Sequence, residues 1–255
     1  SMGGLWLDYA RDDETGGLDW DSPRNQQTNV PGLFAAGECD YQYHGANRLG
    51  ANALLSCIFS GLLVGRALRT FITGRRRSAA DVPARLLGGE AERHRASHAA
   101  LISRSGSENP YLLHRELGQL MTRNVTVVRN NADLQQTLGE LDAMHDRWKR
   151  CALSDRGDWT NQNLSFTRAL GDMIVLARVI AQGALLRDEC RGAHYKPQFE
   201  TPAPTADEPA ALRRQAHEWC RRYGEQNDRW LKTTLARHPP DGPSFAYEPV
   251  ETHLI

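Results

Sequence analysis

The residues best suited to chemistry lie in one stretch, Gly37–Leu55. Arg48 is a permanent cation whose two parallel N–H donors suit a carboxylate. Gly45 and Gly50 keep the backbone around it bare, so that a flat ligand can approach. A helix predicted to begin near Asn52 would direct free N–H groups and the positive end of its dipole toward the same loop. The pattern indicates an anion site, although a tight strand-to-helix turn with a surface arginine accounts for the same residues.

Other motifs that carry chemistry are weak or absent from the sequence. His94 and His98 stand four residues apart on one face of a predicted helix, but two imidazoles without a third ligand are more typical of a solvated helix than of a metal site. No nucleophile elbow, Walker A loop or zinc-protease motif occurs, and the 22 glycines form no Gly-x-Gly-x-x-Gly loop. We therefore predict no metal site and no dinucleotide pyrophosphate loop in this chain.

The composition is that of a globular protein without net charge. The 255 residues include 31 basic and 31 acidic side chains, and 40% are hydrophobic, which favours one large or two small folded domains. The balance of charge removes overall basicity as evidence for a nucleic-acid partner. Five scattered cysteines without a Cys-x-x-Cys pair are typical of reduced thiols in the cytoplasm.

The elements that must position the site begin with strands and turns and end in one helix. Residues 3–8 and 33–36 are predicted to be short strands. Apolar residues then recur at intervals of three and four over 52–73, which predicts a helix with Asn52 as its N-cap. Its uncharged run, 49–65, is shorter than the ~20 residues needed to cross a bilayer. We therefore predict a buried helix.

The rest of the chain is predicted to be mainly helical. Asn109 and Pro110 form an N-cap followed by proline at the first helical position. The last part of the chain is rich in proline and has one amphipathic segment, near 208–222, so we predict a tail there. The expected helices are 84–104, 110–128, 131–150 and 163–189. The predicted organisation is an α/β segment over 1–80, an all-α helical bundle over 81–195 and an extended C-terminal tail over 196–255.

Three islands of sequence resemble the flavoprotein subunit of succinate dehydrogenase and fumarate reductase. The most specific is the His-Gly-Ala-Asn-Arg motif at 44–48. The resemblance extends over essentially the whole chain, as the C-terminal part of a longer protein. It implies that residues 1–80 are the second part of an FAD-binding domain. The islands, in the family's order, are Met2–Trp6, Pro31–Glu38 with His44–Leu55, and Arg187–Tyr195.

The resemblance implies two substrate-binding residues. Arg48 corresponds to the arginine that clamps a carboxylate of succinate or fumarate. His44, beside it, would shape the site rather than transfer a proton. The family's N-terminal FAD motif, its flavin-carrying histidine and its proton-donating arginine would all precede residue 1. No catalytic residue is therefore expected within this chain, which on its own would neither hold FAD nor turn over substrate.

The resemblance also implies four residues that bind FAD, namely Glu38, Asn52, Ala53 and Leu54. Glu38 corresponds to a glutamate that contacts the cofactor on its ribose side. Ala53 and Leu54 correspond to the pair whose backbone N–H groups approach the isoalloxazine, next to Asn52 at the helix start. The positive end of the helix would stabilise negative charge on the reduced flavin. Two positions depart from the family pattern, in which serine commonly stands where this chain has Ala53 and Cys190.

Partners and a location follow from the same resemblance. Electrons would pass to an iron–sulfur subunit, and membrane-anchor subunits would complete a respiratory complex. The protein would then be cytoplasmic and peripheral on the cytoplasmic face of the inner membrane, with no nucleic-acid partner. Two other interpretations are an L-aspartate oxidase-like flavoenzyme, which shares the His-Gly-Ala-Asn-Arg loop, and a non-catalytic helical docking fragment.

Overall fold

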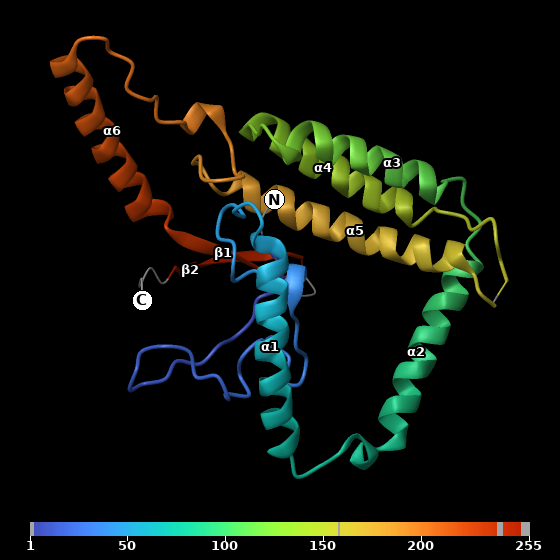
Figure 1. Cartoon of the computed structure of the whole chain (residues 1–255). Helices are drawn as coiled ribbons and strands as arrows, with labels where there is room; N and C mark the ends of the chain where they lie inside the picture. The colour runs from blue at the N-terminus through green and yellow to red at the C-terminus, as the bar shows by residue number, and fades with distance from the viewer. Residues whose placement is uncertain (1–2, 158, 239–241, 251–255) are drawn as a thin grey trace. The chain divides into compact units, whose positions relative to one another are not determined.

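The structure of the protein is a computed structural model that describes residues 3–157, 159–238 and 242–250. By their internal contacts these residues form two units. The N-terminal unit comprises the described residues up to Pro83 together with Arg191–Ala193. The helical unit comprises the described residues of Ala84–Cys190 and His194–Val250. Figure 1 labels the helices and strands of both units.

The N-terminal unit consists mostly of turns around one long helix. Its regular elements are the 3-10 turn η1 (Gly37–Cys39), the helix α1 (Asn52–Thr73) and the 3-10 turn η2 (Ala79–Asp81). The segments predicted to be strands form only isolated bridges, such as Leu5 with Asp40. The described part of residues 1–80 therefore contains no regular strand, which corrects the prediction of α/β structure there. A strand needs a run of consecutive backbone partners, and these segments form only isolated bridges.

Helix α1 has the predicted bounds but is not buried within its unit. Only Ser60, Leu63 and Ala67 are buried, whereas Leu54 is 70% exposed and Leu62 is 65% exposed. Among the described residues it is the one helix that could cross a membrane by length and composition, and 17% of its most apolar window is buried. Core helices of soluble proteins have the same length and composition. The prediction of a buried helix is wrong for this unit, because the turns of the unit cover only one side of α1 and leave the other side exposed.

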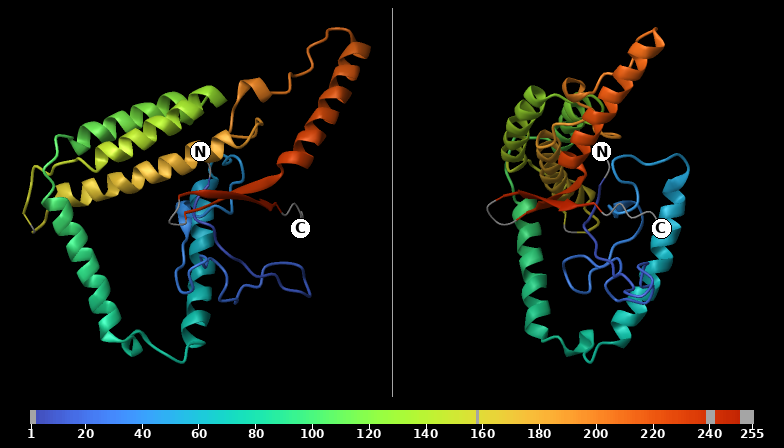
Figure 2. Two further views of the ribbon diagram at one scale, coloured as in Figure 1. Left: turned by 180° about the vertical axis from the view of Figure 1, so that it is seen from behind. Right: turned by 90° about the vertical axis from the view of Figure 1, so that its left-hand side faces the viewer.

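The helical unit begins with four helices, all of which were predicted. They are α2 (Ala84–Ile102), α3 (Pro110–Met121), α4 (Asn131–Trp148) and α5 (Gln162–Leu185). Helix α3 stops earlier than predicted, because a π-helical turn, η3 (Thr122–Thr126), replaces its last turns. In both views α3, α4 and α5 lie side by side (Figures 1 and 2).

The core of the helical unit lies between α3, α4 and α5. Leu113, Leu134 and Leu170 are fully buried in it, one from each helix, and burying each such side chain contributes ~1.5–3 kcal/mol. The indole of Trp148 donates to the carbonyl of Thr167 at 2.6 Å. The same ring covers Gly171 so closely that a side chain added there would come within 2.7 Å of it. The bundle is thus fixed by close apolar packing.

The segment predicted to be an extended tail contains regular structure. A 3-10 turn, η4 (Pro197–Phe199), is followed by α6 (Pro209–Trp230) and by the antiparallel pair β1 (Lys232–Arg237) and β2 (Ser244–Pro249). Figure 2 shows α6 leading into this hairpin. The prediction of an extended tail is wrong over these elements. Pro209 does not oppose the helix, because proline suits its first position, and the predicted amphipathic segment near 208–222 is the first part of α6.

Candidate functional site

The loop that carries Arg48 begins with a turn at His44–Asn47, and the backbone at Gly45 and Gly50 has free space around it. Its turn is closed by a hydrogen bond from the Asn47 N–H to the His44 carbonyl at 3.2 Å. Gly45 occupies the first central position with a φ of +53°, which glycine adopts without strain. A side chain at Gly45 or Gly50 would meet no atom within 4 Å. Arg48 is exposed, so the guanidinium and the bare backbone are both accessible to a ligand.

Two serines on α1 hold the segments of the site. Ser56 Oγ lies 3.0 Å from His44 Nε2 and donates to the Ala53 carbonyl at 2.9 Å. Since a hydroxyl has one proton, His44 Nε2 is then the donor in its bond to Ser56. One turn further along α1, Ser60 Oγ accepts the Gly37 N–H at 2.8 Å and so fixes the start of η1. Sequence analysis missed both serines, although two hydroxyls four residues apart on an apolar helix are a detectable signal.

The first turn of α1 has no side-chain cap. Its N-cap residue, Ala51, has a φ of +66° and offers no oxygen to the helix N–H groups. By contrast, Asn109, Asn130 and Asn161 each accept a backbone N–H at the starts of α3, α4 and α5. The uncapped N–H groups of α1 carry partial positive charge that a ligand can satisfy.

The residues predicted to contact FAD lie in this uncapped turn and on η1. Asn52 is the first helical residue rather than the predicted N-cap, because Ala51 has the left-handed backbone conformation just before it. Asn52 and Ala53 are half-buried and Leu54 is largely exposed. Glu38 is exposed on η1, which Ser60 holds against α1.

A buried polar network supports the loop and was not predicted. The amide of Gln26 donates to Asp40 Oδ2 at 2.7 Å and to the Tyr43 hydroxyl at 3.2 Å. Burial raises the pKa of Asp40 and also that of Tyr43. Gln26 has a φ of +62°, and its Oε1 is buried without a hydrogen-bond partner. No local pattern marks these residues, because they lie 14 and 17 positions apart in the chain.

The third island of resemblance, Arg187–Tyr195, is divided between the two units. Arg191–Ala193 belong to the N-terminal unit, where the Ala193 N–H donates to the Ala46 carbonyl at 2.9 Å. The preceding residues belong to the helical unit, in which Arg187 pairs with the fully buried Glu189.

His194 is a neutral imidazole in the helical unit. Its Nδ1 lies 2.7 Å from Arg129 Nη1, and its Nε2 lies 2.9 Å from the Arg187 carbonyl. A guanidinium can only donate, so Nδ1 accepts and the proton resides on Nε2. Burial lowers the pKa of His194 to about 4. The ring therefore acts as a bridge between Arg129 and the end of α5, and its pKa is a consequence of that structural position.

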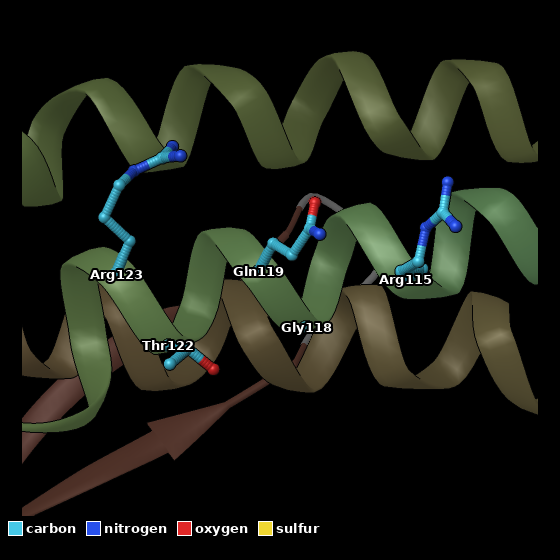
Figure 3. Close-up of a pocket in the computed structure, with 5 residues that line it drawn as sticks. All are labelled: Arg115, Gly118, Gln119, Thr122 and Arg123. Atoms are coloured by element: carbon cyan, nitrogen blue, oxygen red, sulfur yellow. The ribbon is translucent and has the colours of Figure 1, made fainter.

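A shallow surface depression of the helical unit lies along α3 and η3. Its floor is Gly118, and Arg115 and Arg123 flank it, with Arg123 reaching toward α4 (Figure 3). Arg123 lies 3.9 Å from Glu140. All the lining side chains are exposed, so water solvates their charges and the depression lacks the buried polar groups of a formed binding site.

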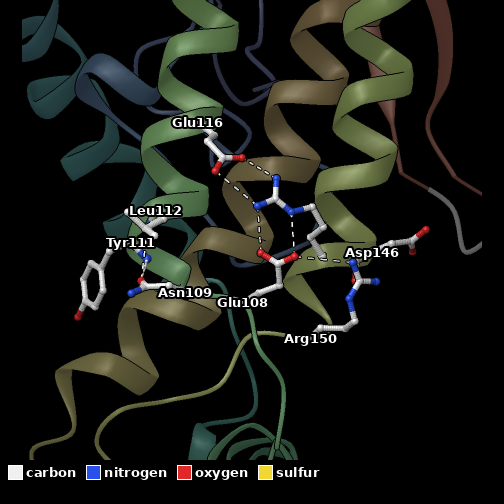
Figure 4. A network of polar contacts seen from close by, with 8 residues as sticks. Glu108, Asn109, Tyr111, Leu112, Glu116, Asp146 and Arg150 are labelled. Atoms are coloured by element: carbon white, nitrogen blue, oxygen red, sulfur yellow. Dashed lines mark hydrogen bonds and ion pairs between the residues drawn. The ribbon is translucent and has the colours of Figure 1, made fainter.

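Charged groups at the start of α3 are structural. Arg147 donates two parallel hydrogen bonds to Glu108 at 3.0 Å and a third to Glu116 at 2.5 Å. Figure 4 shows Glu108 and Glu116 turned toward this guanidinium, beside the N-cap Asn109. The hydrogen bonds from Arg147 lower the pKa of Glu108. The network joins the end of α4 to the start of α3.

The two histidines of α2 form no metal cluster with other ligands. The rings of His94 and His98 lie 6.5 Å apart, and both belong to an exposed part of the helix. Within the part of the chain that the structure describes, no three His, Cys, Asp or Glu side chains gather as metal ligands.

An exposed arginine in an open loop and an uncapped helix start are features that can bind an anion. The chain belongs to the family described as fumarate reductase flavoprotein C-term, whose family model matches residues 114–255. A second model, described as FAD binding domain, matches residues 1–54. These matches confirm the resemblance that the sequence motifs indicated.

Individual relatives agree with this family. The chain is 42% identical to the succinate dehydrogenase flavoprotein subunit of Bacillus subtilis, over all of this chain and 37% of that protein. It is 32% identical to the fumarate reductase flavoprotein subunit of Escherichia coli, over 71% of this chain and 29% of that protein. The chain therefore spans about a third of the length of the curated relatives that it matches.

Solved structures share the fold. A mutant FrdA of the E. coli quinol fumarate reductase superposes with a TM-score of 0.69 at 28% identity, over 90% of this chain and 35% of that chain. Sdh1 of Mycobacterium smegmatis superposes with a TM-score of 0.67 at 24% identity, over 91% of this chain and 34% of that chain. The second likeness shows the fold alone.

Proposed function

We propose that this chain forms the C-terminal part of a flavoprotein that interconverts succinate and fumarate, and that its loop 44–48 holds the dicarboxylate. The observation that carries the proposal is that the exposed Arg48 lies in the loop that leads directly into the uncapped start of α1. The named relatives, which include succinate dehydrogenase and fumarate reductase subunits, support it.

Arg48 is the residue proposed to bind the substrate. Its planar guanidinium can give two parallel hydrogen bonds to one carboxylate, which fixes both the position and the rotation of the substrate. His44 is proposed to shape the same pocket. Its Nε2 proton is engaged with Ser56, so this ring nitrogen is occupied in holding the loop rather than in proton transfer.

The first turn of α1 is proposed to face the flavin. The backbone at Gly45 and Gly50 is open, the N–H groups of Ala53 and Leu54 lie in an uncapped turn, and the Leu54 side chain is exposed. These features fit a flat, partly anionic ring system. FAD, when bound, supplies the acceptor for a hydride from succinate. Glu38 is proposed to hold the ribose side, and the α1 dipole favours negative charge on the ring.

We further propose that the whole protein passes electrons to an iron–sulfur subunit and lies with membrane-anchor subunits on the cytoplasmic face of the inner membrane. The support is the quinol fumarate reductase of E. coli among the structural neighbours, since a quinol is a membrane-soluble electron carrier. The chain's described residues contribute no metal cluster of their own to such a pathway.

A chimera tests the proposal. The matched region of the B. subtilis succinate dehydrogenase flavoprotein subunit, which is 37% of that protein, is exchanged for this chain, and succinate oxidation is measured. Arg48→Lys keeps the charge but loses the paired donors, so kcat/KM should fall by the equivalent of about 2–4 kcal/mol.

The matched control is Arg115→Lys, at an exposed arginine on α3, which should leave succinate turnover unchanged. Flavin content is measured from the visible spectrum of each protein. A chimera that retains flavin and oxidises succinate equally well with lysine at position 48 would disprove the clamp.

A further inference from the structure

We infer that Gly192 and Ala193 are positioning residues for the dicarboxylate loop: they hold the His44–Asn47 turn through its backbone and thereby set the place of Arg48. This inference rests on the proposed function of Arg48. It concerns residues that lie far from the loop in sequence and that belong to the N-terminal unit by their contacts.

The first contact is a backbone hydrogen bond. The Ala193 N–H donates to the Ala46 carbonyl at 2.9 Å. Ala46 is the second central residue of the turn closed by the bond from Asn47 to His44. Its carbonyl points out of the turn, so without Ala193 this bond to the protein would be lost.

The second contact is the close approach of Gly192. A side chain at this position would lie 2.5 Å from the Ala46 carbonyl oxygen and 2.9 Å from Asn47 Cβ. Gly192 also has a φ of +56°, a conformation that residues with a Cβ adopt at a cost. Both the backbone conformation and the available space therefore require glycine, and any larger residue must displace the 46–47 peptide.

The turn is thus held at two points on either side of its tip. His44 is bonded to Ser56 of α1 at 3.0 Å, and Ala46 is bonded to Ala193. Arg48 follows two residues after Ala46, and a shift of the peptide is carried along the chain to the start of its side chain. Because a displacement of about 1 Å in a positioning group can cost on the order of a hundredfold in rate, this second anchor bears on substrate binding.

The experiment uses the full-length chimera and measures the dissociation constant of malonate from the change in flavin absorbance. Malonate is a dicarboxylate that lacks the adjacent methylene carbons needed for oxidation, so binding is separated from turnover. Gly192→Ala should weaken malonate binding by about tenfold or more, raise KM for succinate more than it lowers kcat, and leave the flavin content unchanged.

Gly16→Ala is the matched control. Gly16 also has a positive φ, of +70°, but a side chain there meets no atom within 4 Å, so it reproduces the backbone strain without the contact. It should leave the malonate dissociation constant unchanged. Equal losses in Gly16→Ala and Gly192→Ala would overturn the inference, because strain alone would then explain both.

Arg48→Lys separates this inference from the proposed function. If Arg48→Lys weakens malonate binding and Gly192→Ala does not, the positioning role is wrong and the clamp stands. If neither variant weakens binding, the clamp itself is wrong. Should Gly192→Ala fail to fold, Gly192→Asn replaces it, because asparagine tolerates a positive φ while still adding the Cβ that meets Ala46.

Hydrogen exchange on the unmodified chimera gives a reading that needs no variant. The Ala193 amide should be protected, and bound malonate should increase that protection together with the protection of the Asn47 amide. Rapid exchange at Ala193 with and without malonate would overturn the inference.

Discussion

Different interactions stabilise the interior of each of the two units. The helical unit buries leucines from α3, α4 and α5 in one continuous core. The N-terminal unit buries few large apolar side chains among its described residues and instead leaves Leu54 and Leu62 of α1 exposed. Its segments are joined by polar contacts, among them those of Ser56, Ser60 and Gln26. The scaffold is apolar, and the proposed site is assembled from hydrogen bonds.

This difference has a physical reason. Apolar packing is strong but not directional, so it suits a bundle that provides stability and does not have to place a particular side chain. Hydrogen bonds contribute less net stability, about 0.5–1.5 kcal/mol each, but they fix direction. A loop that must place one guanidinium therefore gains more from bonds at His44 and Ala46 than from additional apolar area.

The largest difference between the units should appear when a leucine is removed from each. Leu134→Ala truncates a side chain with 0% exposure in the core and should cost about 2–5 kcal/mol, because it removes apolar burial and leaves a cavity. Leu62→Ala, at a 65% exposed position on α1, should change stability by less than about 0.5 kcal/mol. Native-state hydrogen exchange measures the two units separately in one chain.

Comparable losses from the two substitutions would contradict the comparison. They would show that α1 is covered in solution and that the N-terminal unit has an apolar core of its own.

The helices could be predicted from the sequence, and the contacts between distant segments could not. The spacing of apolar residues predicted α1 with both its ends, and Asn109 with Pro110 predicted the start of α3, because these signals lie within a few residues of one another. The strand at 33–36 was wrong because the segment forms a single isolated bridge, between Phe34 and Gln27, and no continuous ladder. The hairpin of β1 and β2 was missed because prolines nearby suggested an extended chain.

The site was predicted in outline only. Arg48, His44 and Glu38 were found because a specific motif surrounds them, and their roles stay predictions. The partners that hold them were not found. Gln26 bonds to Asp40 and Tyr43, which lie 14 and 17 residues away in the chain. Ala193 bonds to Ala46, although helices α1 to α5 separate the two residues in the sequence. Such contacts depend on the folded backbone and leave no periodic pattern in the sequence.

Acid should weaken the helical unit through His194. The pKa of this buried imidazole is lowered to about 4 from 6.5, chiefly by burial, whereas its hydrogen bond to the Arg187 carbonyl opposes this shift. The nearby charges of Arg129 and Lys196 also lower the pKa, and that of Glu189 raises it. Between pH 6.5 and 4 the unfolded chain takes up a proton that the folded one does not. Stability from His194 is therefore complete above pH 6.5 and is lost as the pH falls toward 4.

The measurement is the melting temperature of the helical unit between pH 7 and pH 4.5. His194→Gln removes the titrating ring, so its melting temperature should fall less steeply with acidification than that of the unaltered chain. Parallel curves for the two proteins would show that the imidazole is protonated equally in the folded and unfolded states.

The smallest expected effects concern the helix starts, and they should differ in sign between the units. Asn109 accepts the N–H groups of Tyr111 and Leu112 at the start of α3, so Asn109→Ala should destabilise that helix by about 1 kcal/mol. Ala51 caps nothing and holds a φ of +66°, so Ala51→Gly should relieve strain and stabilise α1 by up to about 1 kcal/mol. Hydrogen exchange in the first turn of each helix reports both changes. Destabilisation by Ala51→Gly would mean that the methyl group packs in the folded unit and that the open junction at the start of α1 is narrower than its backbone indicates.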